Sequence, residues 1–550
     1  MVFALGASAF AADTTPVTTK AVDTTLSVTV DYTIEGLYFD GTTLKSSATN
    51  GYYPFNFSFI VSDRTAVGSI TVSNGGSFHW AYAQNADGSY VTDEDGNYVE
   101  STTTNYGVVV LPTTSASTVT VTSASGNTLT ISCAQPSGGT TAAGTELYAY
   151  LPAPAQFVNE GVTTGGWGDA YDSAGTLKGN SATGMSLGFF GGYAVYKFEN
   201  PIADDPTHPY GADFIVYGNA FWNNSEAGCI QVSKDGATWY DIAGSMYYTK
   251  STKGATITYT NPNATEDAGI TIPASNKGTL ADVPYTLTVN GTTTTGTVTK
   301  NTFHNHSWFP LNVNYFVDYV TTETTRKQMA KVDEFSFVSR TLASNGVTDK
   351  LTFTGTLLTD YPGTGKTDQI GFGYCDVHPN KTLGGTIAYN PYQTFTSSSD
   401  YDTKVAGTSG GDPIDIAWAV KSNGTPANLD SIRYVRIYTG MAQMNGIFGE
   451  ISTEVCGVAA CTGSTTETAA TPTISVDGST VTTTNGGILP LSKKSGDYTV
   501  NVTGTGYVYI NGVATTSATI TPTRTGTKVQ IIVQNGEAAP YVTYLNLQKK

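Results

Sequence analysis

Short runs in which apolar β-branched residues alternate with polar ones are the feature that most constrains this fold. Runs such as "STVTVTS" (117–123) and "TLTIS" (128–132) place an apolar side chain at every second position. This period puts the apolar side chains on one face of a strand. Turn formers separate the runs, and the best helical candidate, "TTRKQMAKVDEF" (324–335), is short. The sequence therefore predicts an all-β protein.

The chain is long enough for about three to four domains. Short strands with regular turn signals are typical of sandwiches, so we expect a central jelly-roll-like β-sandwich flanked by smaller Ig-like β-sandwich domains. Stretches rich in Gly, Thr and Ala supply the boundaries between them. The predicted order is a signal-peptide remnant (1–12), a flexible leader (13–25), an N-terminal β-sandwich (26–133), a linker (134–146), the central module (147–461), a second linker (462–472) and a C-terminal Ig-like domain (473–550).

Three features of the sequence favour a secreted protein associated with the cell surface. Ala9-Phe10-Ala11 has the small-x-small pattern at which a secretory signal is cleaved. The net charge is −17 and no basic patch is visible, which argues against a nucleic-acid partner. No apolar run approaches the roughly 18 residues of a membrane-spanning helix, so we expect no transmembrane segment in this chain.

The cysteines do not predict a disulfide framework, because there are five and they are widely spaced. Cys456 and Cys461 are close enough in the chain to pair. The alternative is that they are buried thiols in a large core.

One hairpin can be predicted with its register. Asp235-Gly236 lies between the strand-like runs "CIQVSK" and "ATWYDI". A two-residue turn at this point would pair Val232 with Trp239 and Gln231 with Tyr240. Val232 and Trp239 would then share the core face.

The series of motifs in the central module resembles a family of bacterial cell-surface proteins that are common in gut anaerobes. The resemblance covers about 310 residues, from Leu147 to Val455, and rests on the motifs in order rather than on any one of them. The resemblance implies a location at the cell envelope but says little about the mechanism, although some relatives accompany corrinoid-capture proteins. The motifs include "LPAPAQFVNEG", "SLGFFGGYAVYKFENPI", "GADFIVYGNAF", "IQVSKDGATWYDIAG", "NTFHNHSWFP", "YVRIYTGM" and "FGEISTEV".

The densest cluster of candidate site residues follows the apolar run "DFIVYG" in the elbow "NAFWNNSEAG". Short amides and Ser can bond their own backbone, so the cluster is explained either by a tight β-corner or by a binding site. As a site, Asp213, Asn219 and Glu226 would supply oxygens to a hard cation, with calcium as the candidate ion, or bond a ligand hydroxyl. Asn223 and Asn224 would bind the same ligand.

Aromatic and histidine side chains supply further candidates. Trp222, in the elbow, and Trp167, which glycines flank on both sides, could stack on a sugar if exposed. His304 and His306 would point to one face of a strand, and His304, whose Phe-His step the resembled family retains, is the better candidate metal ligand. Surface or hydrogen-bonded histidines are the alternative.

Two pairs of carboxylates could serve a hydrolase, although acidic pairs are expected by chance in so acidic a chain. Glu450 and Glu454 share a face in "FGEISTEV", and Asp412 and Asp415 lie in "GGDPIDIAW". A glycosidase needs two such groups across a cleft, a separation that sequence does not show.

These observations predict a non-catalytic binding protein whose ligand is a glycan or a small organic molecule, such as a corrinoid. A structural adhesin or stalk and a polysaccharide hydrolase are the alternatives from other functional classes. Binding predicts a concave surface lined by amides and aromatic rings near Trp167, Asn219 and Trp222.

Overall fold

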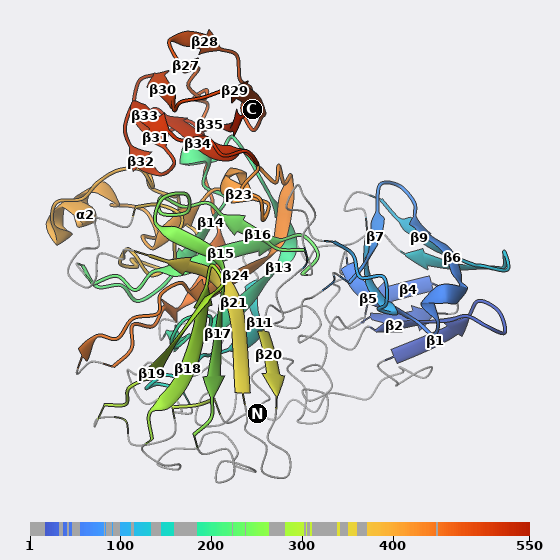
Figure 1. The fold of residues 1–550 in the computed structure, drawn as a ribbon. Helices are drawn as coiled ribbons and strands as arrows, with labels where there is room; N and C mark the ends of the chain where they lie inside the picture. Colours follow the sequence, from blue (N-terminus) through green and yellow to red (C-terminus); the bar gives the residue numbers. More distant parts are fainter. Residues whose placement is uncertain are drawn as a thin grey trace.

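In the computed structural model, strands are the main regular secondary structure of the described residues. The described residues are 17–31, 37–40, 43–46, 56–81, 83, 91, 99–111, 115–133, 145–158, 184–222, 224–236, 238–262, 281–301, 304, 308–310, 338–341, 350–359, 371–446 and 449–550. They form several mainly antiparallel sheets with one α-helix, which confirms the predicted all-β class for this part of the chain (Figure 1). No helix among them is long and apolar enough to cross a membrane.

The N-terminal strands form two five-stranded sheets around one core. The burial of Ser117–Ser123 alternates residue by residue, as its sequence predicts, and Val119 and Val121 are fully buried. One sheet has the order β1 (Val17–Ala21), β2 (Ser27–Asp31), β5 (Asn56–Val61), β8 (Tyr106–Val110), β7 (Ser77–Trp80). The other has the order β3 (Leu37–Asp40), β4 (Thr43–Ser46), β10 (Thr128–Cys133), β9 (Ser117–Ser123), β6 (Val67–Val72), with a short 3₁₀ helix, η1 (Arg64–Ala66), before β6.

Two expectations for the N-terminal part meet different outcomes. The predicted flexible leader, residues 13–25, is wrong where it is described, because β1 pairs with β2 along its whole length. Asp23 fixes the turn between these strands by accepting hydrogen bonds from the backbone N–H groups of Thr25 and Leu26. The predicted signal remnant, 1–12, lies outside the described residues, as does most of the first linker, 134–146.

The central strands form four sheets. The largest has the order β11 (Thr145–Leu151), β13 (Tyr193–Ala203), β24 (Ser431–Thr439), β15 (Gly228–Ser233), β16 (Tyr240–Ile242), β23 (Ala419–Val420). A five-stranded sheet has the order β19 (Thr292–Val298), β18 (Val283–Val289), β17 (Ser251–Thr260), β21 (Lys350–Leu358), β20 (Val338–Thr341). Smaller sheets are β22 (Asp412–Ile414), β14 (Phe214–Tyr217), β26 (Gly457–Ala460), and β12 (Met185–Ser186) with β25 (Glu454–Val455). The helices are η2 (Pro209–Gly211), α2 (Ser398–Lys404) and η4 (Ile416–Trp418).

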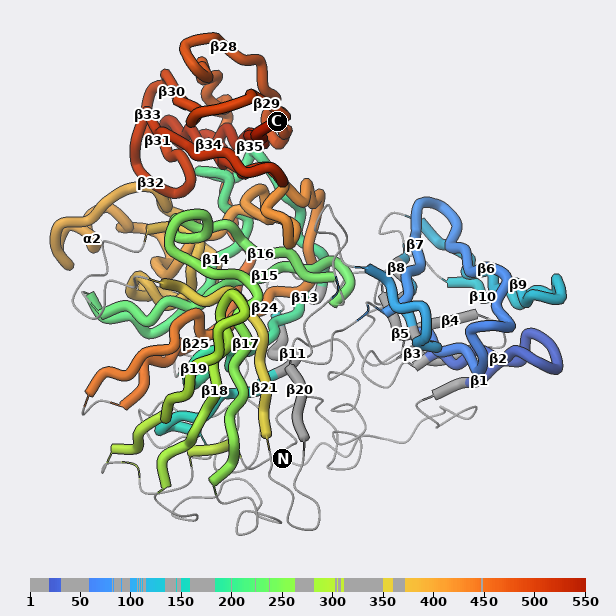
Figure 2. Tube along the Cα trace, in the orientation of Figure 1, coloured from blue at the N-terminus to red at the C-terminus, as the bar shows by residue number. Residues whose placement is uncertain are grey.

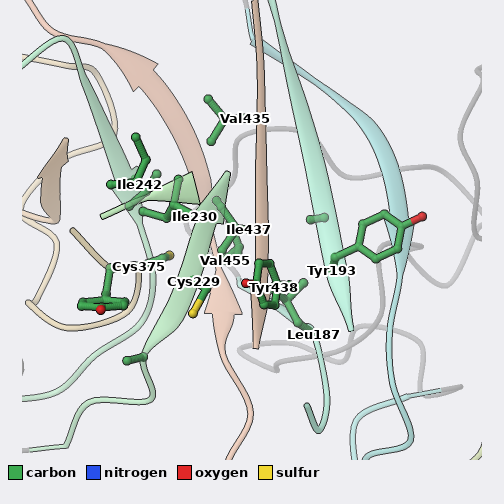
Figure 3. Packing of buried hydrophobic residues seen from close by; sticks show 14 of the residues in the cluster. Leu187, Tyr193, Cys229, Ile230, Ile242, Cys375, Val435, Ile437, Tyr438 and Val455 are labelled. Atoms are coloured by element: carbon green, nitrogen blue, oxygen red, sulfur yellow. The ribbon is translucent and has the colours of Figure 1, made fainter. Parts of the chain in front are cut away.

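The two large central sheets share one hydrophobic core. Figure 3 shows part of it, where Tyr193, Cys229 and Tyr438 lie close together on three strands of the six-stranded sheet. The ring of Tyr193 meets that of Phe353 on β21 edge to face, with ring centroids 6.5 Å apart. The Tyr438 hydroxyl accepts a hydrogen bond of 2.9 Å from the backbone N–H of Thr356, also on β21. Core packing therefore accounts for many of the aromatic residues of this region.

The predicted hairpin exists, but its register is wrong by one residue. Val232 pairs with Tyr240 and Gln231 with Asp241, so the loop is longer than two residues. The cause is a set of side-chain hydrogen bonds: the Asp235 carboxylate accepts from the backbone N–H of Thr238 at 2.7 Å, and from the Ser233 hydroxyl at 2.9 Å. This bonded loop takes up an extra residue.

The C-terminal strands form two sheets with a core of their own. One has the order β28 (Ser479–Val481), β27 (Thr473–Val476), β30 (Tyr498–Thr503), β33 (Ser517–Ile520). The other has the order β29 (Ile488–Lys493), β35 (Tyr541–Lys549), β34 (Thr527–Gln534), β31 (Tyr507–Ile510), β32 (Val513–Ala514). In the tube view this unit lies directly against the central strands (Figure 2).

The contact between the C-terminal unit and the central module is a packed, apolar one. Tyr509 lies over Tyr392 and Phe372, with ring centroids 5.5 and 5.2 Å away, and its hydroxyl donates to the Tyr392 carbonyl at 3.1 Å. Val542 and Tyr544 belong to the same buried cluster as the central core. The second predicted linker, 462–472, contains no strand. Its Thr465 N–H donates to the Thr207 carbonyl of the central module, and its Glu467 carboxylate accepts from the Glu537 N–H of the C-terminal unit.

Candidate functional site

The predicted elbow follows β14 and is anchored by one buried side chain. The strand Phe214–Tyr217 is fully buried, and Gly218 ends it. The backbone N–H of Asn219 donates to Oδ1 of Asp376 at 2.7 Å. A Cβ on Gly218 would lie 2.4 Å from the same oxygen, so glycine is required where the elbow passes over the carboxylate. The elbow is therefore shaped by a residue that is distant in the sequence.

Asp376 joins the elbow to a second segment. Its Oδ2 accepts from the backbone N–H of Glu454 at 3.1 Å, and its carbonyl accepts from the N–H of Glu226 at 3.0 Å. The residue has a left-handed backbone, with φ of 63°, which Asp tolerates better than most residues. These bonds bring three carboxylates from distant segments together.

Glu226, Asp376 and Glu454 form the group that we call the acidic triad. One carboxylate oxygen from each lies within 4.8 Å of the others. Two unit charges at that separation repel by about 3 kcal/mol in a medium of effective dielectric constant 20. Burial and the charge of Asp376 raise the pKa of Glu226 to about 8. Burial, followed by the charges of their neighbours in the triad, also raises the pKa of Asp376 and of Glu454 well above its usual range.

Nothing basic offsets these charges within the described part of the chain. None of the ion pairs found there involves the acidic triad or Glu450. The site can therefore exist in two chemical forms: with protons held on its carboxyl groups, or with a cation bound between them.

A fourth carboxylate, that of Glu450, lines the same cavity as Glu226 and Glu454. Its Oε1 accepts from the backbone N–H of Gln156 at 3.1 Å. Its Oε2 is buried and has no hydrogen-bond partner, although the side chain is only 3% exposed. Burial raises the pKa of Glu450 to about 8. The cavity has a volume of about 380 Å³ and is lined by Gln156, Phe157, Asn219, Phe221, Asn224, Glu226, Asn445, Glu450, Ser452 and Glu454.

His304 supports a wall of this pocket and is not among its lining residues. Its ring meets Phe157 edge to face, with centroids 4.8 Å apart, and its carbonyl accepts from the Trp308 indole N–H at 3.2 Å. Neither group of described carboxylates that lies close enough to share an ion includes His304. The predicted metal role of His304 therefore finds no support here, and His306 lies outside the described residues.

The predicted ligand-binding residues divide into three sets. Asn219 and Asn224 line the pocket, together with Glu226. Trp222 does not line it: its ring packs against Phe395 and Tyr401, with centroids 6.4 and 6.3 Å away. The neighbouring Phe221, 64% exposed, is the aromatic side chain of the elbow that reaches solvent beside the pocket. Trp167 and Asn223 lie outside the described residues.

Asp213 belongs to a different carboxylate group, with Asp204 and Asp415, so the predicted set of Asp213 and Glu226 around one ion is wrong. Its oxygens are already bonded: Oδ1 accepts from His208 Nδ1 at 3.1 Å, and Oδ2 accepts from the Ile416 N–H at 2.9 Å. Asp412, the predicted partner of Asp415, is not a member of that group, and its Oδ1 lies 2.9 Å from Nδ1 of His378.

Glu450 and Glu454, predicted to share a face, both line the pocket, although only Glu454 lies in a strand, β25. Sequence reasoning missed Asp376, Phe221, Gln156 and Asn445. Phe221 and Trp222 are adjacent aromatic residues, and nothing in the sequence shows which of the two is the more exposed. Gln156 lies in "LPAPAQFVNEG", a motif whose residue types do not by themselves indicate a binding site.

All five cysteines are buried free thiols, including Cys456 and Cys461. The chain matches no model of a known protein family and no curated protein. The chemistry of the pocket is therefore the main support for a function.

Proposed function

We propose that this chain is a secreted cell-surface protein whose central module binds a glycan, without catalysis, in the pocket beside the elbow. The observation that carries the proposal is the composition of that pocket: amide, hydroxyl and carboxylate groups with one exposed ring, Phe221, at its edge. Sugars offer hydroxyl groups to polar acceptors and an apolar face to an aromatic ring. The resemblance to bacterial cell-surface proteins agrees with a role at the envelope.

The size of the pocket limits the ligand. A volume of about 380 Å³ lies at the low end for small-molecule sites. It favours one or two sugar units of a longer glycan over a whole corrinoid macrocycle. The sheet arrangement is compatible with a jelly-roll-like central sandwich between smaller Ig-like sandwiches, folds in which loops carry binding sites. The apolar contact of the C-terminal unit with the central module is less favourable to the stalk alternative, in which domains follow one another in a row.

Binding to an array of bacterial and host glycans tests the proposal, followed by calorimetry with any glycan that binds. Phe221→Ala should weaken binding at least tenfold, because it removes the stacking ring from a position where the side chain supports no core. Tyr507→Ala is the matched control, since Tyr507 is an aromatic residue 37% exposed on the C-terminal unit, and it should bind as the wild type does. No binding to any glycan, or equal affinity for Phe221→Ala, would contradict the proposal.

A hydrolase is the second candidate, because Glu226 and Glu450 both have a raised pKa and face one cavity. A carboxylic acid that keeps its proton near neutral pH can act as a general acid. Release of reducing ends from a bound glycan, abolished by Glu450→Gln, would favour this candidate. Binding without release would favour the lectin-like role.

A further inference from the structure

We propose that the acidic triad, Glu226, Asp376 and Glu454, binds one Ca²⁺ ion at the base of the pocket, beside the unpartnered carboxylate oxygen of Glu450. The inference concerns the same pocket as the proposed function, but it rests on the carboxylates alone. Each can therefore fail without the other.

The first support is the geometry of the acidic triad. Three side chains from distant segments bring oxygens within 4.8 Å of one another, a spacing that lets a single cation touch all three. Backbone hydrogen bonds to Asp376 from Asn219 and Glu454 hold this arrangement. Calcium–oxygen bonds are about 2.3–2.6 Å long, so oxygens on opposite sides of the ion are separated by up to roughly twice that length.

The second support is independent of the triad. Oε2 of Glu450 is buried and has no hydrogen-bond partner, and Glu450 is one of the residues that line the cavity. Buried carboxylate oxygens are nearly always bonded, and one that is not calls for an ion or a water in the space that it faces. The Oε1 atom of the same group is tied to the Gln156 N–H, which fixes the side chain in place.

The donor set selects the ion. Every candidate ligand is an oxygen, from carboxylates, from the Ser452 hydroxyl or from the amides of Asn219 and Asn224. Zinc and copper favour sites that contain His or Cys, whereas Ca²⁺ accepts six to eight oxygens in flexible geometry. Mg²⁺ usually keeps several waters and takes only one or two carboxylates. Three clustered carboxylates, with a fourth on the same cavity as two of them, therefore fit Ca²⁺ best.

The other carboxylate group makes a useful contrast. In the group of Asp204, Asp213 and Asp415, the buried Asp213 already accepts from a histidine and from backbone N–H groups. No unpartnered buried oxygen is found there among the described residues. A substitution in that group therefore serves as the control for the proposed Ca²⁺ site.

The test is calorimetric titration of Ca²⁺ into the full chain after treatment with EDTA and dialysis. The wild type should bind one Ca²⁺ per chain, and its Tm should rise as Ca²⁺ is added, because an ion that binds only the folded state stabilises it. Mg²⁺ should bind at least tenfold more weakly. Absence of Ca²⁺ binding up to millimolar concentration would overturn the inference, as would preference for Mg²⁺.

Two isosteric variants locate the site. Glu454→Gln and Glu450→Gln should each weaken Ca²⁺ binding at least tenfold, whereas Asp204→Asn should leave affinity and stoichiometry unchanged. In EDTA both glutamine variants should melt close to the Tm of the wild type, because without the ion these carboxyl groups hold their protons and the amide replaces a neutral group of the same shape; this result also shows that they fold. Unchanged affinity in both variants, or loss of binding in Asp204→Asn, would overturn the assignment.

The glycan array, repeated in Ca²⁺ and in EDTA, separates this inference from the proposed function. Calcium uptake by the wild type without binding to any glycan would support the ion site and overturn the lectin-like role. Glycan binding by a chain that takes up no Ca²⁺ would support the lectin-like role and overturn the ion site.

Discussion

Tyr392 is the residue at which the packing of the C-terminal unit on the central module can be tested most directly. Its side chain is buried, and its ring lies 4.8 Å from that of Phe372 and 5.5 Å from that of Tyr509 on the C-terminal unit. Its hydroxyl accepts a hydrogen bond of 2.9 Å from the Trp418 indole N–H. Two substitutions separate these contributions: Tyr392→Phe removes the hydroxyl, and Tyr392→Ala also removes the ring.

The expected losses of stability follow from the buried groups. Tyr392→Phe leaves the buried Trp418 N–H without its acceptor, which should lower the free energy of unfolding by about 1–3 kcal/mol. Loss of a buried aromatic ring costs about 3–5 kcal/mol. Because the two contributions are not fully additive, we expect about 4–6 kcal/mol for Tyr392→Ala.

Chemical denaturation measures both variants. Circular dichroism reports on every sheet, whereas tryptophan fluorescence does not report directly on residues 473–550, since they contain no tryptophan. In the wild type the C-terminal unit should unfold together with the central module. In Tyr392→Ala, the weakened contact should separate the two transitions. Equal effects of the Phe and Ala variants, or a loss below about 1 kcal/mol for Ala, would refute a stabilising contact between the units.

Two further predictions concern the elbow and the second carboxylate group. Gly218→Ala should lower stability by about 1–3 kcal/mol, because its Cβ would lie 2.4 Å from Asp376 Oδ1; an unchanged Tm would mean that the elbow shifts freely. Burial, with the charge of Asp213 next, raises the pKa of Asp204 to about 7, from 3.8. The folded state therefore holds this proton more tightly than the unfolded chain. Its contribution to stability is present below about pH 4 and is lost as the pH rises to about 7. Asp204→Asn should reduce the fall in Tm between pH 5 and 8, and an identical fall in both proteins would contradict the assignment.

The parts of this structure that could be predicted from the sequence depend on local patterns. The alternation in β9 fixes which side chains face the core, and the elbow brings Asn219, Asn224 and Glu226 to one pocket because they are close in the chain.

The rest depends on contacts between distant segments or on small differences between neighbours. Nothing local shows that Asp376 would meet Asn219 and Glu454. Trp222 is half-buried because Phe395 and Tyr401 pack on it, whereas its neighbour Phe221 is exposed. The hairpin register differs from the predicted one because side-chain hydrogen bonds at Asp235 stabilise a loop longer than a two-residue turn.

The three backbone bonds of Asp376 have a thermodynamic consequence. Both of its carboxylate oxygens and its carbonyl accept hydrogen bonds from backbone N–H groups, so the side chain is held in one orientation before a ligand binds. Ligand binding then requires little further ordering of the residues that Asp376 holds in place, because their conformational entropy is already lost when the protein folds. Substitutions that remove or weaken these hydrogen bonds should therefore weaken ligand binding, even where they remove no atom that contacts the ligand.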